Sequence, residues 1–310
     1  MKTPVERIVR LGPEGEGLSV VTLPDQPREG APAMLFMNAG VVHRIGPHRL
    51  NVKLARALAQ DGITSIRLDL SGLGDSPGPA HGSHSGAQAI LDLQAAMDHL
   101  EQTLGFRRFM VFGLCSGAVN GYRLALADER VAGLVMFDGY VYPTWKTHVL
   151  RRATRFHTLP WSALLNKLTH WLQGRTPPPR EQLEGAGDTH LGIPTRAKFA
   201  EAMSTLVRRG TSVYLVFSGS FLEGHNYHDQ LRDAFGHAMF LDHVRYDFMP
   251  DVDHTVTPLA AQRKVLGAVR QWVLQDVCGA PSATRAAASA ARAASGASTG
   301  SSIQERTSPP

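Results

Sequence analysis

The most constraining feature of the sequence is a cysteine that lies between two glycines where an apolar run meets a helical pattern. Residues 109–112 read Phe-Met-Val-Phe, which is typical of a buried strand, and Gly113-Leu114-Cys115-Ser116-Gly117 follows. Ala118 to Ala127 then has the apolar spacing of a helix. The glycines permit a sharp strand-to-helix turn, a nucleophile elbow, that raises the Cys115 side chain above the sheet. We therefore expect strands and helices to alternate around this turn.

Such an alternation runs through most of the chain. Strands are expected at 5–11, 18–23, 33–38, 63–70, 109–112, 131–137, 211–217 and 240–247, and helices at 50–61, 85–104, 118–127, 228–235 and 258–277. The first two strands are separated by glycine-rich turn residues, so they should form a hairpin. The remaining pattern predicts an α/β fold with a mostly parallel central sheet flanked by helices.

One crossover is several times longer than the pattern requires. The interval between the strands ending at Phe137 and starting at Thr211 predicts an inserted helical lid at residues 141–209. Helical patterns lie near 145–156, 161–172 and 196–207, with Pro177-Pro178-Pro179 as a break. The core is then divided into residues 1–140 and 210–278. Residues 279–310 contain mainly Ala, Ser, Thr and Gly, which predicts a disordered tail.

Composition restricts the partners and the location. The formal charge is +5 over 310 residues, and the excess lies largely in residues 146–180 and in the tail. No nucleic-acid-binding motif accompanies it, so we expect no nucleic acid partner, whereas an anionic substrate or membrane surface suits the charge. No signal peptide and no apolar stretch of about 20 residues is present, so we expect a cytoplasmic protein without stable membrane insertion. The sequence leaves the oligomeric state open.

A cysteine on such a turn acts as a nucleophile only with a base and an orienting acid. His254 lies in the loop after the last strand, from which it can reach the carboxyl edge of the sheet, and is the expected base. The expected acid is Glu223, in the loop after the penultimate strand, with Asp138, after the preceding strand, as the alternative. Asp229 and Asp253 are weaker alternatives. An inert buried thiol is the other interpretation of Cys115.

The tetrahedral oxyanion formed by attack of Cys115 on an acyl carbon would need two N–H donors. We expect these from the backbone of Ser116 and of Val41, which follows Gly40 in the loop after a buried strand. Ser116 would itself be the nucleophile only if the turn were shifted by one residue.

A basic loop lies beside this expected oxyanion hole. Arg44 and Arg49, with two neighbouring histidines, are candidates for binding a carboxylate or phosphate of the substrate. The interpretation that we favour for this loop is either a solvated face or an internal brace to Asp69 or Asp75.

Four motifs together resemble those of the α/β-hydrolase superfamily, and the resemblance extends to about residue 277. They are Asn38-Ala39-Gly40, the run from Asp69 to Ser76, the cysteine elbow and Asp253-His254. Within this superfamily, two features are similar to a bacterial branch of cysteine-elbow hydrolases: the elbow sequence Gly-Leu-Cys-Ser-Gly-Ala and the basic loop. Some hydrolases of this branch accompany exosortase or polysaccharide-biosynthesis systems. The elbow cysteine is also similar to that of dienelactone hydrolases, which lack a lid.

The resemblance implies acyl transfer without a cofactor or metal, through a thiolate and an S-acyl enzyme. We expect a hydrolase of carboxylic ester or thioester bonds in a small acyl substrate. An acyltransferase that uses the same intermediate is the alternative among enzymes. A ligand-binding protein that kept the fold without the chemistry is the alternative from another class.

Overall fold

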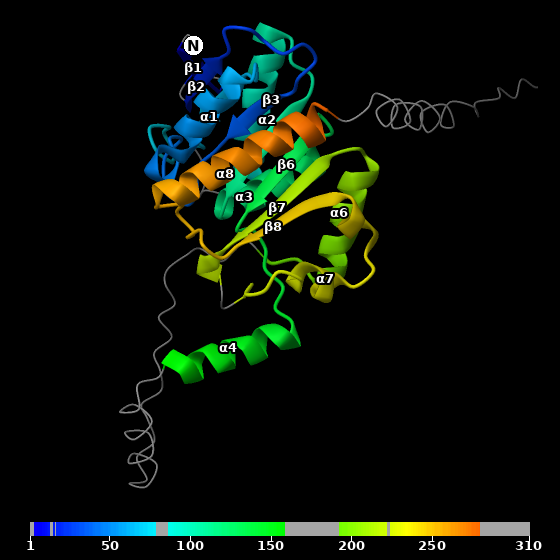
Figure 1. Cartoon of the computed structure of the whole chain (residues 1–310). Coiled ribbons are helices and arrows are strands. Elements are labelled where there is room, and N and C mark those ends of the chain that lie inside the picture. Colours follow the sequence, from blue (N-terminus) through cyan, green and yellow to red (C-terminus); the bar gives the residue numbers. More distant parts are fainter. Residues whose placement is uncertain are drawn as a thin grey trace, which may run out of the picture.

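Eight strands form one sheet in the computed structural model, which describes residues 3–12, 15, 17–78, 86–158, 192–221 and 224–279. The strand order is β1-β2-β4-β3-β5-β6-β7-β8, and Figure 1 shows the sheet at the centre of the molecule. The strands are β1 (Val5–Leu11), β2 (Gly17–Leu23), β3 (Ala33–Phe36), β4 (Ser65–Leu68), β5 (Phe109–Leu114), β6 (Val131–Phe137), β7 (Ser212–Ser218) and β8 (Val244–Met249). β2 is antiparallel to β1 and β4, and the other neighbours are parallel. The predicted hairpin and mostly parallel sheet are confirmed.

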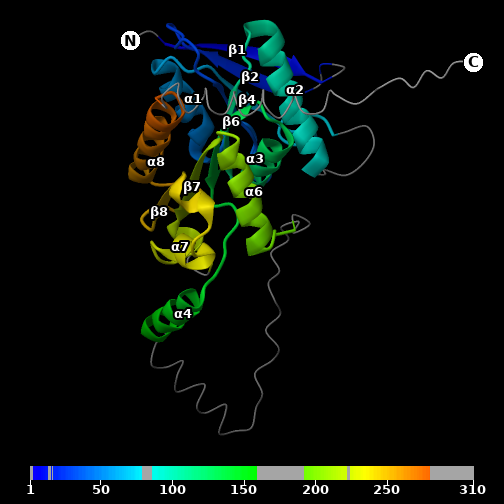
Figure 2. The same ribbon diagram turned by 90° about the vertical axis from the view of Figure 1, so that its right-hand side faces the viewer.

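Helices cover both faces of the sheet because side chains of successive strand residues point to opposite sides. α1 (Leu50–Gln60) and α8 (Leu259–Trp272) share one buried apolar cluster with the sheet, and α2 (Gly86–Leu104), α3 (Ser116–Ala127) and α6 (Arg196–Arg208) share the other. Figure 2, turned by 90°, shows these two helical layers on either side. α8 continues as a π-helical turn at Val273–Val277. This is the predicted α/β-hydrolase fold.

The last strand begins later than the sequence indicates. We expect it from residue 240, but Met239–Asp242 forms a 3-10 turn and β8 starts at Val244. The physical reason is the Phe240 side chain, which is fully buried and meets the ring of Phe235 edge-on at 5.3 Å between centroids. Phe240 thus enters the core before the chain extends.

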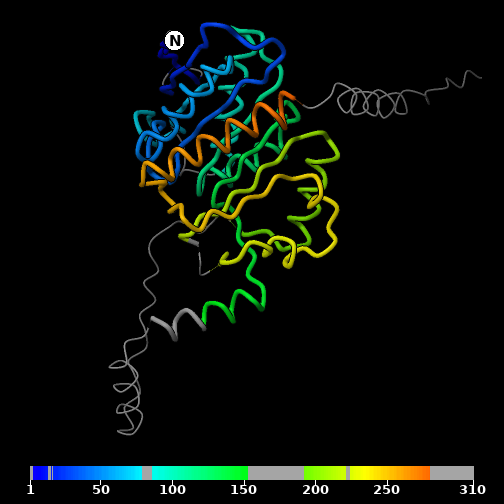
Figure 3. Tube along the Cα trace, in the orientation of Figure 1, coloured from blue at the N-terminus to red at the C-terminus, as the bar shows by residue number. Residues whose placement is uncertain are grey.

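The two ends of the predicted lid differ from each other. α6 packs on the sheet, since Phe199, Met203 and Leu206 are buried in the core. α4 (Trp145–Thr158) instead stands away from the sheet, as the chain trace in Figure 3 also shows. The predicted helix at 161–172 and the proline break lie outside the described residues, so the lid stays a prediction. Residues 280–310, which include nearly all of the predicted tail, lie outside them too.

Candidate functional site

The expected elbow is present where β5 meets α3. Cys115 has a φ of 57° and a ψ of −120°, a backbone conformation that a non-glycine residue rarely adopts. The flanking glycines make room for it. A Cβ on Gly113 would lie 2.2 Å from the carbonyl oxygen of Gly117, and one on Gly117 would lie 2.7 Å from that of Asn38. The close approach of these three backbone segments therefore requires glycine at both positions and raises Cys115 at the carboxyl edge of the sheet.

His254 and Asp138 meet at the same edge. Nδ1 of His254 lies 2.8 Å from Oδ2 of Asp138, whose side chain is fully buried. The His254 side chain also interacts with that of Cys115, which lowers the pKa of the thiol and raises the pKa of the imidazole. Because Nδ1 faces Asp138, Nε2 is the ring nitrogen left to face the thiol. Cys115, His254 and Asp138 thus form a continuous line of polar contacts.

Two serines, one that ends β7 and one just beyond it, hold the acid and the histidine in place. The Asp138 carboxylate accepts from the backbone N–H of Ser218 at 2.7 Å and from its hydroxyl at 2.6 Å. The Ser220 hydroxyl accepts from the backbone N–H of His254 at 2.8 Å. Asp138 has a φ of 48°, again unusual for a residue with a side chain, and its three hydrogen bonds stabilise that conformation.

These contacts change the charges of the site. The hydrogen bond to Asp138, followed by that to Cys115, raises the pKa of His254 from 6.5 to about 10. The hydrogen bond to His254 lowers the pKa of the Cys115 thiol from its ordinary value of 9.0, although burial opposes the change. Both directions favour a thiolate–imidazolium pair, which titrates as a coupled unit. A thiolate is the nucleophilic form of cysteine.

The loop that we expect to supply an oxyanion donor is tied directly to the elbow. The Ser116 hydroxyl accepts from the backbone N–H of Gly40 at 2.8 Å, and an isolated bridge joins Ala39 and Val42. Val41 lies at the tip of this turn and is 86% exposed. The backbone N–H of Ser116 faces the Cys115 sulfur. The Ser116 hydroxyl thus has a partner in the loop, which supports Cys115 as the elbow residue.

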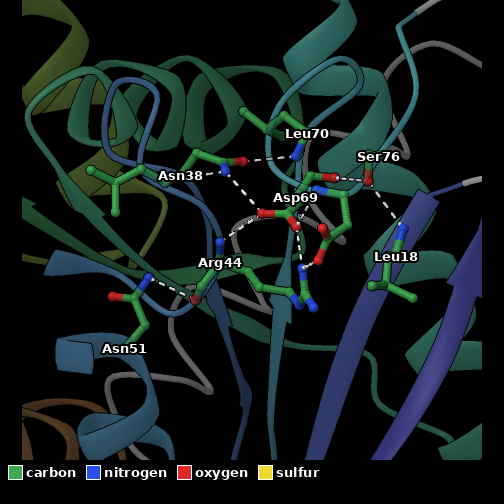
Figure 4. Close-up of polar contacts among 9 residues, drawn as sticks. Leu18, Asn38, Arg44, Asn51, Asp69, Leu70 and Ser76 are labelled. Carbon is green, nitrogen blue, oxygen red and sulfur yellow. Dashed lines mark hydrogen bonds and ion pairs between the residues drawn. The ribbon is translucent and has the colours of Figure 1, made fainter. Parts of the chain in front are cut away.

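A buried carboxylate braces the base of that loop (Figure 4). Asp69, whose side chain is fully buried, accepts from the side-chain amide of Asn38 at 3.0 Å and from the backbone N–H of Arg44 at 2.6 Å. The Arg44 guanidinium forms ion pairs with Asp69 and, at 2.6 Å, with Asp75. Asn38 also accepts from the backbone N–H of Leu70 at 2.7 Å. Of the solvated face and the internal brace that the sequence left open for this loop, the structure has the brace, which engages the charge of Arg44.

The remaining predicted residues fall in different places. Glu223, the preferred acid, lies outside the described residues, whereas the alternative Asp138 contacts His254. Asp253 accepts from the backbone N–H of Thr257 at 2.8 Å and shapes the histidine loop instead. Asp229 lies beside His228, 3.4 Å from its Nδ1. Arg49 is exposed directly before α1 and has a φ of 61°.

Ser218 and Ser220 belong to this arrangement although neither was expected from the sequence. A signal was present, because Phe217-Ser218-Gly219-Ser220 ends an apolar strand with small polar residues. Gly219 is required there, since a Cβ on it would lie 2.1 Å from the carbonyl oxygen of Pro250 in the histidine loop. That contact joins two loops that are distant in the sequence.

Comparison with protein-family models gives a match to Hydrolase_4, described as serine aminopeptidase, S33, over residues 40–245, more than half of the chain. The chain belongs to this S33 family. It is therefore a member of an α/β-hydrolase family. The family description refers to serine, whereas the elbow of this S33 member holds Cys115. A search of curated proteins finds no match to the sequence.

Solved structures agree with this fold. The esterase PF2001 from Pyrococcus furiosus matches with a TM-score of 0.55 and 14% identity over 87% of this chain and 91% of its own. Est1E from Butyrivibrio proteoclasticus has a TM-score of 0.54 and 13% identity over 89% and 100%. The proline iminopeptidase of Mycobacterium smegmatis has a TM-score of 0.50 and 18% identity over 89% and 100%. At these identities the similarity concerns the fold alone.

Proposed function

We propose that this S33-family hydrolase cleaves carboxylic ester or thioester bonds with Cys115 as nucleophile, His254 as general base and acid, and Asp138 as the orienting carboxylate. The observation that carries the proposal is the line of contacts from the Cys115 thiol through the His254 ring to the Asp138 carboxylate, 2.8 Å from Nδ1. We place the protein in the cysteine-elbow branch on the same basis, together with its resemblance to hydrolases that accompany exosortase or polysaccharide-biosynthesis systems.

The first half of the reaction forms an S-acyl enzyme. The Cys115 thiolate adds to the carbonyl carbon, and the carbonyl π electrons move onto oxygen, where the backbone N–H groups of Ser116 and Val41 stabilise the charge. The tetrahedral intermediate collapses as its bond to the alcohol or thiol leaving group breaks. His254 donates its proton from Nε2 to that leaving group.

The second half restores the enzyme. Neutral His254 takes a proton from water at Nε2 while the water oxygen adds to the thioester carbon. The C–S bond then breaks, the acid leaves, and the thiolate is again paired with the protonated histidine. Asp138 holds the Nδ1 proton throughout and favours the charged ring. Arg49 is the candidate for contact with an anionic group on the substrate, since the charge of Arg44 is engaged by Asp69 and Asp75.

Intact-mass spectrometry after exposure to p-nitrophenyl acetate and acetyl thioesters tests the proposal. We expect an acetyl adduct on the wild-type chain that is absent from Cys115→Ala and decays in water. Iodoacetamide should alkylate Cys115 faster than an ordinary thiol, and His254→Ala should abolish that advantage. A wild-type chain without any adduct or ester turnover, and with an ordinary alkylation rate at Cys115, would contradict the enzyme assignment and favour a ligand-binding protein. Transfer of the acetyl group to an added amine or alcohol faster than to water would favour the acyltransferase.

A further inference from the structure

The helix α4 has no role in the proposed chemistry. It starts at Trp145, shortly after Asp138 at the carboxyl end of β6, so it leaves from the sheet edge that carries Cys115 and His254. Figures 1 and 2 both show it projecting beyond the body of the molecule. Whatever α4 contacts is therefore brought to the same edge as the candidate site.

The first turn of α4 is anchored to the body. The Thr144 hydroxyl lies 2.6 Å from that of Tyr227, and the Asn226 side chain donates to the carbonyl oxygen of Thr147 at 3.1 Å. Lys146 pairs with Asp233, which lies in α7 (Gln230–Phe235), at 2.7 Å. These contacts fix the direction in which the helix leaves the body.

Beyond this anchor α4 exposes apolar side chains. Trp145 is 72% exposed, Val149 53% and Leu150 42%. Trp145 and Val149 are one helical turn apart, so they lie on the same side of α4. Large apolar side chains that are exposed side by side mark a contact surface more often than single ones do.

The charge of α4 indicates what this surface meets. Its sequence, WKTHVLRRATRFHT, contains Lys146, Arg151, Arg152 and Arg155 and no acidic residue. Lys146 is paired with Asp233, whereas Arg152 is exposed. A helix with tryptophan and aliphatic residues beside arginines suits the interface of an anionic bilayer, where the apolar side chains enter the headgroup region and the arginines meet lipid phosphates. Nucleic acid would use the arginines but gain little from Val149 and Leu150.

We propose that α4 docks the protein onto membrane surfaces that contain anionic lipids. The docking that we propose is peripheral; in the described part of the chain there is no helix that could span a bilayer. The helix lies at the edge that carries Cys115, so docking turns the candidate site toward the lipid. If the proposed function holds, the acyl substrate then reaches Cys115 from the bilayer surface.

Vesicle sedimentation with the full chain tests the docking. We expect the protein to bind vesicles of phosphatidylcholine mixed with phosphatidylglycerol, to bind phosphatidylcholine alone weakly, and to lose binding as salt is raised. The double change Arg151→Gln and Arg152→Gln should weaken partitioning about twenty-fivefold, at roughly fivefold for each arginine near an anionic surface. Trp145→Ser should weaken it about tenfold.

Matched controls come from α8. Leu259 is 66% exposed and Arg263 is exposed, so Leu259→Ser and Arg263→Gln make the same kinds of change elsewhere and should leave vesicle binding unaltered. Brominated lipid should quench the tryptophan fluorescence of the wild type more than that of Trp145→Phe. This comparison tests the contact of Trp145 with lipid while α4 stays in place.

Three results would overturn the docking. They are the absence of anionic-vesicle binding, equal binding by the α4 variants and the α8 controls, and tighter binding of duplex DNA than of anionic vesicles through the same arginines. Turnover of soluble p-nitrophenyl acetate without vesicles should be unchanged in the α4 variants. A failure of docking thus leaves the proposed chemistry intact, and an inactive Cys115 leaves vesicle binding measurable.

Discussion

The assignment of Asp138 as the orienting acid leads to the sharpest prediction about the site. Asp138→Asn keeps the size of the side chain and one of its oxygens, but removes the charge that stabilises protonated His254. The asparagine still fits beside Ser218, whose amide and hydroxyl lie 2.7 and 2.6 Å from the present carboxylate. The variant should therefore fold, and its defect should lie in protonation.

The size of the effect follows from the pKa of His254. That pKa rises from 6.5 to about 10, with the Asp138 hydrogen bond as the largest cause. Each pKa unit is a factor of ten in the protonation equilibrium, so loss of the charge should lower the thiolate–imidazolium population by on the order of 100- to 1000-fold. Turnover should fall by about 100- to 10,000-fold, as expected when a triad acid loses its charge.

Iodoacetamide alkylation of Cys115 as a function of pH provides the assay. Because the pKa of the Cys115 thiol lies below 9.0, the wild type should stay reactive as pH falls below the range of an ordinary thiol. In Asp138→Asn the pH midpoint should move up toward that of a free cysteine, as it should in His254→Ala. Ester turnover is measured on the same preparations.

Two control substitutions make the prediction refutable. Asp253→Asn removes a carboxylate that bonds to Thr255 and Thr257, and should leave the alkylation midpoint in place. Glu223→Gln tests the acid that the sequence favours. If Glu223→Gln shifts the midpoint and abolishes turnover while Asp138→Asn changes neither, the reasoning from the observed contact is wrong.

Three further predictions concern the support of the site. Ser116→Ala removes the hydroxyl that accepts from the backbone N–H of Gly40 at 2.8 Å, and it should slow ester turnover about 10- to 100-fold. Iodoacetamide alkylation of Cys115 forms no oxyanion and should keep its rate, so equal slowing of both reactions would contradict this prediction. Gly117→Ala should lower the melting temperature, since the new Cβ would lie 2.7 Å from a backbone oxygen. A Cβ on Gly267 would meet open space, so Gly267→Ala should not lower it, and equal melting temperatures of the two variants would refute the packing argument. Asp69→Asn breaks a buried ion pair and should lower the free energy of unfolding in urea by about 3 kcal/mol. The side chain of Asp75 is 62% exposed, so Asp75→Asn should change the urea midpoint little. The reverse order of the two effects would show that the brace depends on the outer carboxylate.

Much of the fold could be predicted because its signals are local. Apolar runs such as 131–137 and the glycine-flanked turn at Cys115 each depend on a few neighbouring residues. The late start of β8 could not be predicted, since Phe240 fits a strand pattern and is drawn into the core by Phe235, which belongs to another element. Tertiary packing decides such boundaries.

The sequence by itself determined the elbow with Cys115, the α/β order of the elements, and the placement of His254 in the loop after the last strand. It did not decide between the two main candidate acids, Asp138 and Glu223, because they follow adjacent strands of a parallel sheet and both loops reach the same edge. Only the tertiary structure brought Asp138 to 2.8 Å from His254 and bound it to Ser218. The reason is physical: a local pattern specifies which strand a residue follows, whereas side-chain direction depends on backbone conformation, here a φ of 48° at Asp138, and on contacts between distant loops.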